Sequence, residues 1–321
     1  MTKKYDVITI GSGTVDVFVL ENNKEINKKI QFLAGSKIPL EDILVLSGGG
    51  GVNTASAMSK LGLKVGFLGN IGSGYNSEIL LREIKKFGID FLGQRDKTHT
   101  GYSIILRTDK NHRTILAYKG ASNNLDFYKI NLKKVNTKWF YFANVGGKSF
   151  ETQLKLLNFA KKNDINIAFN PGVDGIKKRK KINTILKNTD LLALNLEEAT
   201  LILRAKHSPR EIIKRLHKIG SKTICLTDGE NGGYVSDGIN FYEYKPRKVK
   251  IVGTTGTGDA FASSFLTGLI RSYSIEDSIK LALVNSESVL REIGANKGLL
   301  SFRKAKYLIN SGKFNIKKKK L

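Results

Sequence analysis

The chain of 321 residues contains one cysteine, four prolines and no apolar run near the length of a membrane-spanning helix. A single thiol, Cys225, excludes a disulfide framework and makes a reducing, cytoplasmic location the expectation. Because Cys225 lies inside the apolar run KTICLT, we interpret it as a small core residue. The amino-terminus lacks the long apolar stretch of a signal peptide, so neither secretion nor membrane insertion is predicted.

Acidic residues are the other scarce class, because 28 Asp and Glu stand against 54 Lys and Arg, a formal net charge of +26. Such a balance can indicate a protein that binds nucleic acid or an anionic surface. Only the runs 177–181 and 317–320 are dense, and no aromatic residues are interleaved with them to stack on bases. We therefore favour charge spread over solvated faces, and nucleic-acid binding stays the more remote alternative.

Strand-like apolar runs alternate with amphipathic helical runs through most of the chain. Examples are YDVITIG at 5–11, VNTASAMSKLG at 52–62, KVGFLGNIG at 64–72 and NSEILLREIKKFG at 76–88. This alternation predicts an α/β fold, in which helices cover both faces of a mostly parallel sheet. Since prolines are few and no low-complexity linker is present, we expect one domain over 1–321.

Two segments, at about 15–47 and 92–122, break the alternation and resemble short β-runs joined by polar turns. The clearer pattern is TGYSIILRTDKNHRTILAYKG, which predicts a hairpin with turn residues 109–111. Two β-rich insertions in one α/β core predict a small sheet that packs beside the core as a lid.

The stretch GTTGTGDAF, at 253–261, joins a strand-like run to a helix-like run. In an open α/β sheet, ligands bind beyond the carboxyl ends of the strands. A glycine-rich turn there exposes N–H groups at a helix amino-terminus, and Gly256, Thr257 and Gly258 are placed to bind an anion with them. Asp259 could then take a proton from a hydroxyl that attacks phosphorus. The alternative is a plain glycine turn with a helix-stabilising Asp.

A second glycine cluster, SGGGGVNTASAMSKLG at 47–62, also precedes a helix. Glycine lets a ligand approach the backbone, and the Asn53 amide can both donate to and accept from hydroxyl groups. A sugar or polyol site and a simple turn with Asn53 near the helix cap both fit this pattern. Asp16, just past the first strand, occupies the position where a dinucleotide-binding fingerprint has its third glycine, so this fingerprint is not matched. The Asp16 carboxylate could instead accept hydrogen bonds from two hydroxyls of a ligand.

Two further turns follow strand-like runs. In NLEEA, Asn195 and Glu198 lie on the same side of a helix start and could hold water around Mg²⁺, or form a capping box, or do both. In TDGENGGY, Thr227, Gly229 and Gly232 form a turn that could line a nucleotide, or could simply lead into the next strand.

Taken in order, these motifs resemble the ribokinase or PfkB family of carbohydrate and nucleoside kinases, over about 5–302. The glycine cluster and the helix after it are similar to the family's amino-terminal signature, and GTTGTGDAFASSFLTGL is similar to its carboxy-terminal signature. NLEE matches the N-x-x-E motif, and TDGENG matches T-x-G-x-x-G. The resemblance implies a ribokinase-like three-layer core with a β-sheet lid, and an ATP-dependent, Mg²⁺-requiring phosphotransferase.

The resemblance also implies a task for each motif. Asp259 looks like the base that activates the acceptor hydroxyl, beside an anion hole for the phosphoryl group at Gly256, Thr257 and Gly258. The other implied contacts are Asp16, Gly49 and Asn53 for the substrate, Asn195, Thr227, Gly229 and Gly232 for the nucleotide, and Glu198 for Mg²⁺ through water.

Two positions depart from the family's pattern. Gly253 stands where the family commonly has Asp, which helps to hold K⁺ near the anion hole in relatives that a monovalent cation activates. K⁺ activation is therefore in doubt. Gly50 stands where sugar kinases often have Lys, which removes a donor on the substrate side and weakens an assignment to ribose.

The expected reaction is transfer of the γ-phosphoryl group of ATP to a hydroxyl of a sugar. Nucleoside and phosphosugar acceptors stay open, because the predicted lid is rich in aromatic and basic residues. These residues are Phe18, Phe32, Tyr102, Tyr118, Arg107, Arg113 and Lys119. A homodimer formed through the lid also stays open, since relatives often dimerise there.

Overall fold

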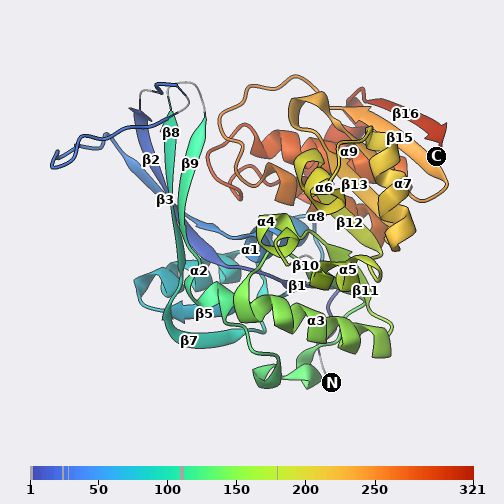
Figure 1. Ribbon diagram of the computed structural model, residues 1–321, viewed down its shortest axis with the longest axis horizontal. Helices are drawn as coiled ribbons and strands as arrows, with labels where there is room; N and C mark the ends of the chain where they lie inside the picture. Colours follow the sequence, from blue (N-terminus) through green and yellow to red (C-terminus); the bar gives the residue numbers. More distant parts are fainter. Residues whose placement is uncertain (1–2, 24, 28, 109–111, 179) are drawn as a thin grey trace.

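The computed structural model describes residues 3–23, 25–27, 29–108, 112–178 and 180–321, so the predicted turn at 109–111 lies outside the described residues. Among these residues, ten strands form one central sheet in the order β16-β15-β14-β13-β12-β11-β10-β1-β4-β6 (Figure 1). The strands are β1 (Val7–Ile10), β4 (Val65–Leu68), β6 (Asp90–Phe91), β10 (Trp139–Phe142), β11 (Asn166–Phe169), β12 (Leu191–Asn195), β13 (Thr223–Thr227), β14 (Gly233–Ser236), β15 (Asn240–Lys245) and β16 (Asn315–Lys320).

The sheet is parallel from β6 to β13 and antiparallel from β13 to β16. Its parallel strands are short and almost wholly apolar, as strands covered on both faces must be. Side chains alternate between the faces: Tyr141 of β10 packs into one core, while its neighbours Phe140 and Phe142 pack into the other. The predicted mostly parallel sheet between two helical layers is confirmed, and Cys225 is buried in the core on β13.

Helices cover both faces of this sheet. One core is shared with α1, α2, α8 and α9, and the other with α3, α5, α6 and α7. The helices are α1 (Gly50–Lys60), α2 (Tyr75–Lys86), α3 (Gly147–Lys162), α4 (Gly172–Ile176), α5 (Lys180–Leu186), α6 (Leu196–Leu203), α7 (Pro209–Ile219), α8 (Thr257–Ile270), α9 (Ile275–Val289) and α10 (Phe302–Ser311). In the part of the chain that the structure describes, no helix is long and apolar enough to cross a membrane.

The sequence signals at helix ends are visible in α7. The Ser208 side chain accepts a hydrogen bond from the N–H of Glu211, and Pro209 occupies the first turn, where it costs no hydrogen bond. The helix ends at Gly220, whose positive φ of 133° suits glycine.

A smaller sheet, which we call the lid sheet, has the order β3-β2-β8-β9 and stands beside the core in Figure 1. Its strands are β2 (Thr14–Asn23), β3 (Ile43–Gly48), β8 (Gly101–Thr108) and β9 (Arg113–Tyr118). The smaller sheet that the sequence predicted is therefore present. Part of the second β-rich segment lies elsewhere, because β7 (Gln94–His99) pairs with β5 (Asn70–Ser73) in a separate two-stranded sheet.

The terminal lysine run forms the edge strand β16, antiparallel to β15 and at the far end of the core from the lid sheet (Figure 1). Its lysine side chains are exposed. A charged edge strand discourages further strand pairing, so protection of this sheet edge accounts for the run without any ligand.

Candidate active site

The predicted site residues come from distant parts of the chain and gather beyond the carboxyl ends of the parallel strands. Asn195 and Thr227 end neighbouring strands and lie opposite each other in the register of β12 and β13. Asn53 and Asp259 lie in the first turns of α1 and α8, which pack against each other. This is the edge at which open α/β sheets bind ligands.

Asp259 and Asn53 are joined directly. The Nδ2 atom of Asn53 donates a hydrogen bond of 2.8 Å to Oδ2 of Asp259. The other carboxylate oxygen, Oδ1, lies 3.9 Å from the point where a Cβ atom on Gly50 would stand. The base that the sequence proposed is therefore held over the amino-terminal end of α1, with one oxygen anchored by an amide.

The environment of Asp259 makes its carboxyl group easier to protonate. Burial is the main cause that raises its pKa from 3.8 to about 6, and the charges of Glu198 and Asp16 act in the same direction, while the amide of Asn53 opposes them. A pKa near the working pH suits a group that must both accept and release a proton. The carboxylates of Glu198 on α6 and Asp16 on β2 thus both lie within electrostatic reach of Asp259.

The amino-terminus of α8 is uncapped. No described residue accepts a hydrogen bond from the backbone N–H of Thr257, Gly258 or Asp259, and no side chain caps the helix. Gly256 precedes it with φ of 79°, and a Cβ there would lie 2.2 Å from Cβ of Ala295, so this position requires glycine. Unsatisfied N–H groups at a helix start bind anions.

Thr257 and Gly258, which follow Gly256, differ in their surroundings. A Cβ on Gly258 would meet no atom within 4 Å, so this glycine borders open space. The Thr257 hydroxyl instead donates to the Thr254 carbonyl at 3.1 Å, which stabilises the turn itself. The backbone N–H of Thr257 therefore has no acceptor among the described residues, whereas its side chain is engaged.

The amino-terminus of α1 is occupied by Ser12, which sequence reasoning missed. Its carbonyl accepts from the N–H groups of Gly51 and Val52 at 3.0 and 3.2 Å, and its hydroxyl accepts from Gly50 at 3.2 Å. A Cβ on Gly49, where φ is 87°, would lie 2.6 Å from the Ser12 carbonyl oxygen. Close packing of the backbone thus explains why position 49 is a glycine without any ligand. For Gly49, the structure supports the simple turn rather than the sugar site.

Asp16 lies buried on β2 of the lid sheet, opposite Ser103 of β8. Its Oδ1 accepts a hydrogen bond of 2.9 Å from the Thr14 hydroxyl. Burial raises its pKa, while hydrogen bonds from Thr14 and Ser103 and the charge of Lys119 lower it in part. A Cβ on Gly48 would lie 2.0 Å from Oδ2, so the glycine there leaves room for this carboxylate.

Glu198 and Asn195 form a full capping box. The N–H of Glu198 donates to Oδ1 of Asn195 at 2.7 Å, and the N–H of Asn195 donates to Oε2 of Glu198 at 3.0 Å. Burial is the main cause that raises the pKa of Glu198. The cap interpretation is confirmed, and Oε1 of Glu198 accepts no hydrogen bond from the described residues.

The three residues of the TDGENGG turn differ in their surroundings. Thr227 donates to the carbonyl of Leu194 at 3.3 Å, and Gly229, with φ of 53°, borders open space. A Cβ on Gly232 would lie 2.0 Å from the Tyr244 carbonyl oxygen. Gly232 is therefore explained by the close approach of β15, whereas the nucleotide contacts predicted at Thr227 and Gly229 stay predictions.

Asn296 is a second residue that sequence reasoning missed. Its Nδ2 lies 3.1 Å from the Ser47 hydroxyl and 3.4 Å from Oδ1 of Asn53, which in turn holds Asp259. It lies in the loop after α9, where no periodicity or motif marks it. Only the packing of that loop against α1 shows its connection to the site.

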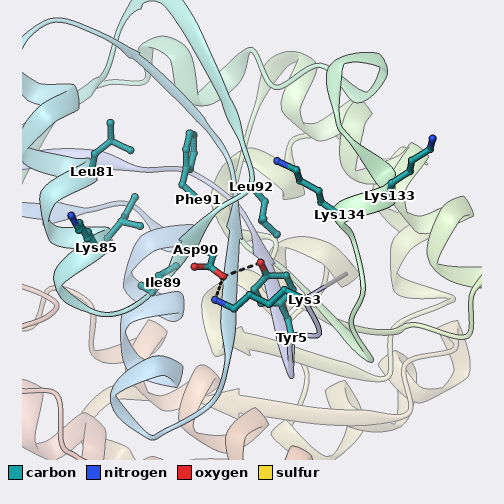
Figure 2. Close-up of a pocket in the computed structure, with 11 residues that line it drawn as sticks. Lys3, Tyr5, Leu81, Lys85, Ile89, Asp90, Phe91, Leu92, Lys133 and Lys134 are labelled. Carbon is teal, nitrogen blue, oxygen red and sulfur yellow. Dashed lines mark hydrogen bonds and ion pairs between the residues drawn. The ribbon is translucent and has the colours of Figure 1, made fainter. Parts of the chain in front are cut away.

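A cavity of about 870 Å³ lies elsewhere, between α2, the edge strand β6 and the amino-terminal segment. Figure 2 shows Lys3 and Tyr5 directed at its acid, Asp90, to which Tyr5 donates a hydrogen bond of 2.9 Å. None of the predicted site residues lines it. Cavity size therefore does not identify the site here; the converging polar groups do.

A model of pfkB family carbohydrate kinases matches residues 20–301. The chain belongs to this family. It is therefore a kinase, a phosphotransferase with an alcohol group as acceptor, which confirms the predicted enzyme class. Family members include sugar and nucleoside kinases, and the acceptor is not decided by membership.

Individual relatives of this PfkB-family kinase differ in acceptor. It is 26% identical to an ATP-dependent 6-phosphofructokinase of Thermoanaerobacterium thermosaccharolyticum, covering 91% of this chain and 90% of the relative. It is 29% identical to a ribokinase of Lactococcus lactis, covering 98% and 100%. The fold matches that of an Arabidopsis thaliana ribokinase complexed with ribose and ATP, with a TM-score of 0.79, 18% identity and coverage of 97% and 100%.

Proposed function

We propose that this PfkB-family kinase transfers the γ-phosphoryl group of ATP to a hydroxyl group of a small sugar. The observation that carries the proposal is the placing of Asp259 beside the uncapped amino-terminus of α8. Asp259, with a pKa of about 6, would accept the proton of the sugar hydroxyl. The backbone N–H groups beside it would stabilise the negative charge of the phosphoryl group.

In this mechanism, Asp259 takes the proton of the attacking hydroxyl on Oδ1, because Oδ2 is engaged by Asn53. The hydroxyl oxygen bonds to the γ-phosphorus as the bond from that phosphorus to the bridging oxygen breaks, and ADP leaves. The N–H groups of Thr257 and Gly258 donate to the oxygens of the transferring phosphoryl group, where negative charge is concentrated. The buried carboxylate of Asp16 accepts hydrogen bonds from other hydroxyls of the sugar and so orients it.

The nucleotide would lie along the ends of β12 and β13, against Asn195, Thr227 and Gly229. Mg²⁺ would neutralise phosphate charge there when bound. The described residues hold no cluster of three acidic, histidine or cysteine ligands for a metal, whereas Glu198 presents one carboxylate oxygen that no neighbour occupies. This donor set fits Mg²⁺ that keeps several waters and takes its other ligands from phosphate oxygens.

A phosphorylated sugar is the second candidate acceptor. Lys119, at the end of the lid sheet, acts electrostatically on Asp16 and forms an ion pair with Asp174 at 3.3 Å. A cation in this position could bind the phosphate of a sugar phosphate. The similarity to a 6-phosphofructokinase favours this candidate over a nucleoside.

The nucleoside alternative depends on aromatic residues of the lid sheet. Phe18 is buried and Phe32 is exposed outside the sheet strands, so neither is placed as a wall for a base. Tyr102 and Tyr118 lie opposite each other on β8 and β9, but on the face that carries Val15, whereas Asp16 and Ser103 lie on the other face. The lid sheet therefore offers no aromatic wall beside Asp16 from these two residues.

The lid sheet also carries a patch of exposed apolar side chains, which we propose as a contact between two copies of the chain. Its members on β3 and β9 are Ile43, Val45, Leu116 and Tyr118, which the strand register places on one face of the lid sheet. Exposed apolar patches mark interaction surfaces. Sedimentation should show a dimer that the double variant Val45→Lys, Leu116→Lys converts to monomer; a wild-type monomer at micromolar concentration would contradict it.

The central experiment is an ATP-consumption screen over pentoses, hexoses, sugar phosphates and nucleosides with Mg²⁺. We expect turnover with a sugar or sugar phosphate, and a loss of about 10²–10⁴-fold in Asp259→Asn with MgATP binding retained. Asp164→Asn, an exposed acid with positive φ, is the matched control. Turnover by Asp259→Asn at the wild-type rate would rule out the assigned base, and no turnover with any acceptor would rule out the proposed function.

A further inference from the structure

The loop that leads into α8 is held by two arginines of the lid sheet. Nη2 of Arg107, on β8, donates to the Val252 carbonyl at 2.9 Å. Nη1 of Arg113, on β9, donates to the Thr254 hydroxyl. Val252 and Thr254 flank Gly253, where many relatives have the Asp that helps to hold a monovalent cation.

The two arginines lie directly opposite each other in the register of β8 and β9. Like charges at such positions repel and destabilise a sheet unless both groups find acceptors. Here both guanidinium groups turn to the same loop, and they line a cavity of only about 30 Å³ together with Gly253. The contacts with the loop thus offset a pairing that the lid sheet alone would disfavour.

The residues present do not fit a monovalent cation held as in those relatives. Gly253 has no carboxylate, and a Cβ there would lie 2.7 Å from the Glu292 carbonyl oxygen, so an Asp would require a backbone shift. The Val252 carbonyl, an oxygen of the kind that coordinates alkali cations, is already bonded to Arg107. The described residues offer no cluster of acidic, histidine or cysteine ligands in its place.

We propose that Arg107 and Arg113 supply the positive charge that a monovalent cation provides in those relatives, so that this kinase needs no K⁺. The inference rests on the proposed function of the α8 amino-terminus. Thr254 connects the arginines to that terminus, because its carbonyl accepts from the Thr257 hydroxyl at 3.1 Å. Guanidinium groups stay protonated and bind carbonyl and hydroxyl oxygens directionally, so they hold this turn and its charge in place.

The first test uses the unaltered protein. MgATP affinity by calorimetry, and turnover with the best acceptor, are measured in KCl and in tetramethylammonium chloride at equal ionic strength. We expect both quantities to differ by less than about fivefold, the lower end of ordinary coupling between sites. A stimulation by K⁺ of about fivefold or more overturns the inference. Because MgATP binding needs no acceptor, the test stands even where the acceptor screen, and with it the proposed function, fails.

The second test removes the charge. Arg107→Ala should lower turnover by about tenfold or more, consistent with the loss of a hydrogen bond from a charged donor. Guanidinium chloride at sub-denaturing concentration should restore part of it, whereas tetramethylammonium should not. Lys37→Gln, which removes an exposed charge from the loop between β2 and β3, should turn over normally. A folded Arg107→Ala protein with wild-type turnover, or a loss that guanidinium does not relieve, contradicts the proposal; where the variant does not fold, the cation test on the unaltered protein decides.

Discussion

Asn53 donates a hydrogen bond of 2.8 Å to Asp259, a residue 206 positions away in the chain. The bond joins the first turns of the two helices that flank the site, and it opposes the effect of burial on the pKa of Asp259. It therefore links the two glycine-rich motifs directly, and the proposed base is the residue that it holds.

Replacing Asn53 by Ala should move the acidic limb of the pH–rate profile upward. The amide stabilises the ionised carboxylate, so its loss raises the pKa of Asp259 above the present value of about 6. Because the base must be ionised, kcat/KM of the variant should begin to fall at a pH about one unit higher than in the wild type. Asn183→Ala, on an exposed face of α5, is the control. An unshifted limb in Asn53→Ala would show that Asp259 does not control the profile.

Asp259→Asn should make the folded protein more stable at alkaline pH. The folded-state pKa of about 6 exceeds the usual value of 3.8, so the folded protein holds a proton that the unfolded chain releases. Stability from this group is full below about pH 4 and is lost as pH rises through about 6. At pH 8 the variant should gain roughly 1–3 kcal/mol in free energy of unfolding, and at pH 4 almost nothing.

Urea unfolding at several pH values measures this difference. Asp164→Asn, exposed to solvent, should show the same stability as the wild type at every pH. If the gain of Asp259→Asn were the same at pH 4 and pH 8, titration of the carboxyl group could not be its cause.

Two glycines of the same turn should respond oppositely to Ala. Gly256→Ala meets both a positive φ of 79° and the Ala295 side chain, so it should cost about 1–3 kcal/mol of stability. Gly258→Ala meets open space and should fold normally, yet its methyl group would stand where the phosphoryl group is proposed to lie. We therefore expect a lower kcat in a protein of normal stability.

Unfolding curves and kcat for the pair separate these effects. Wild-type kcat in Gly258→Ala would mean that no ligand approaches this backbone. Wild-type stability in Gly256→Ala would contradict the tight packing of the turn against Ala295.

Local signals in the sequence predicted the parts of the site that depend on neighbours in the chain. The glycine turn before α8 and the capping box of Asn195 and Glu198 are both set within a few residues. The strand-like run expected directly before that turn was wrong, because residues 246–252 form a loop between β15 and α8. Contacts between distant segments were not predictable in this way. Ser12 caps α1 only because β1 ends beside it, and Asn296 reaches Asn53 only because the loop after α9 folds back on α1.

The fold shows the same division. The alternation of strand-like and helix-like runs predicted the parallel sheet, because each buried strand has a short, apolar sequence. Strand β16 was not predicted, since a lysine run has no strand pattern of its own. It becomes a strand by pairing its backbone with β15, an interaction that depends little on side chains. The roles of the two lid arginines likewise depend on how the lid sheet meets the loop at Gly253.

Replacing Glu198 by Gln should weaken the response to Mg²⁺ without unfolding α6. Gln preserves the capping box with Asn195, so the free energy of unfolding should change by less than about 0.5 kcal/mol. The variant lacks the charge that would order water around Mg²⁺, so the Mg²⁺ concentration for half-maximal turnover should rise about 10-fold or more. Glu197→Gln is the matched control, because Glu197 lies in the same first turn and takes no part in the capping box. An equal shift in both variants, or none in Glu198→Gln, would remove Glu198 from the metal site and leave it only its role as a helix cap.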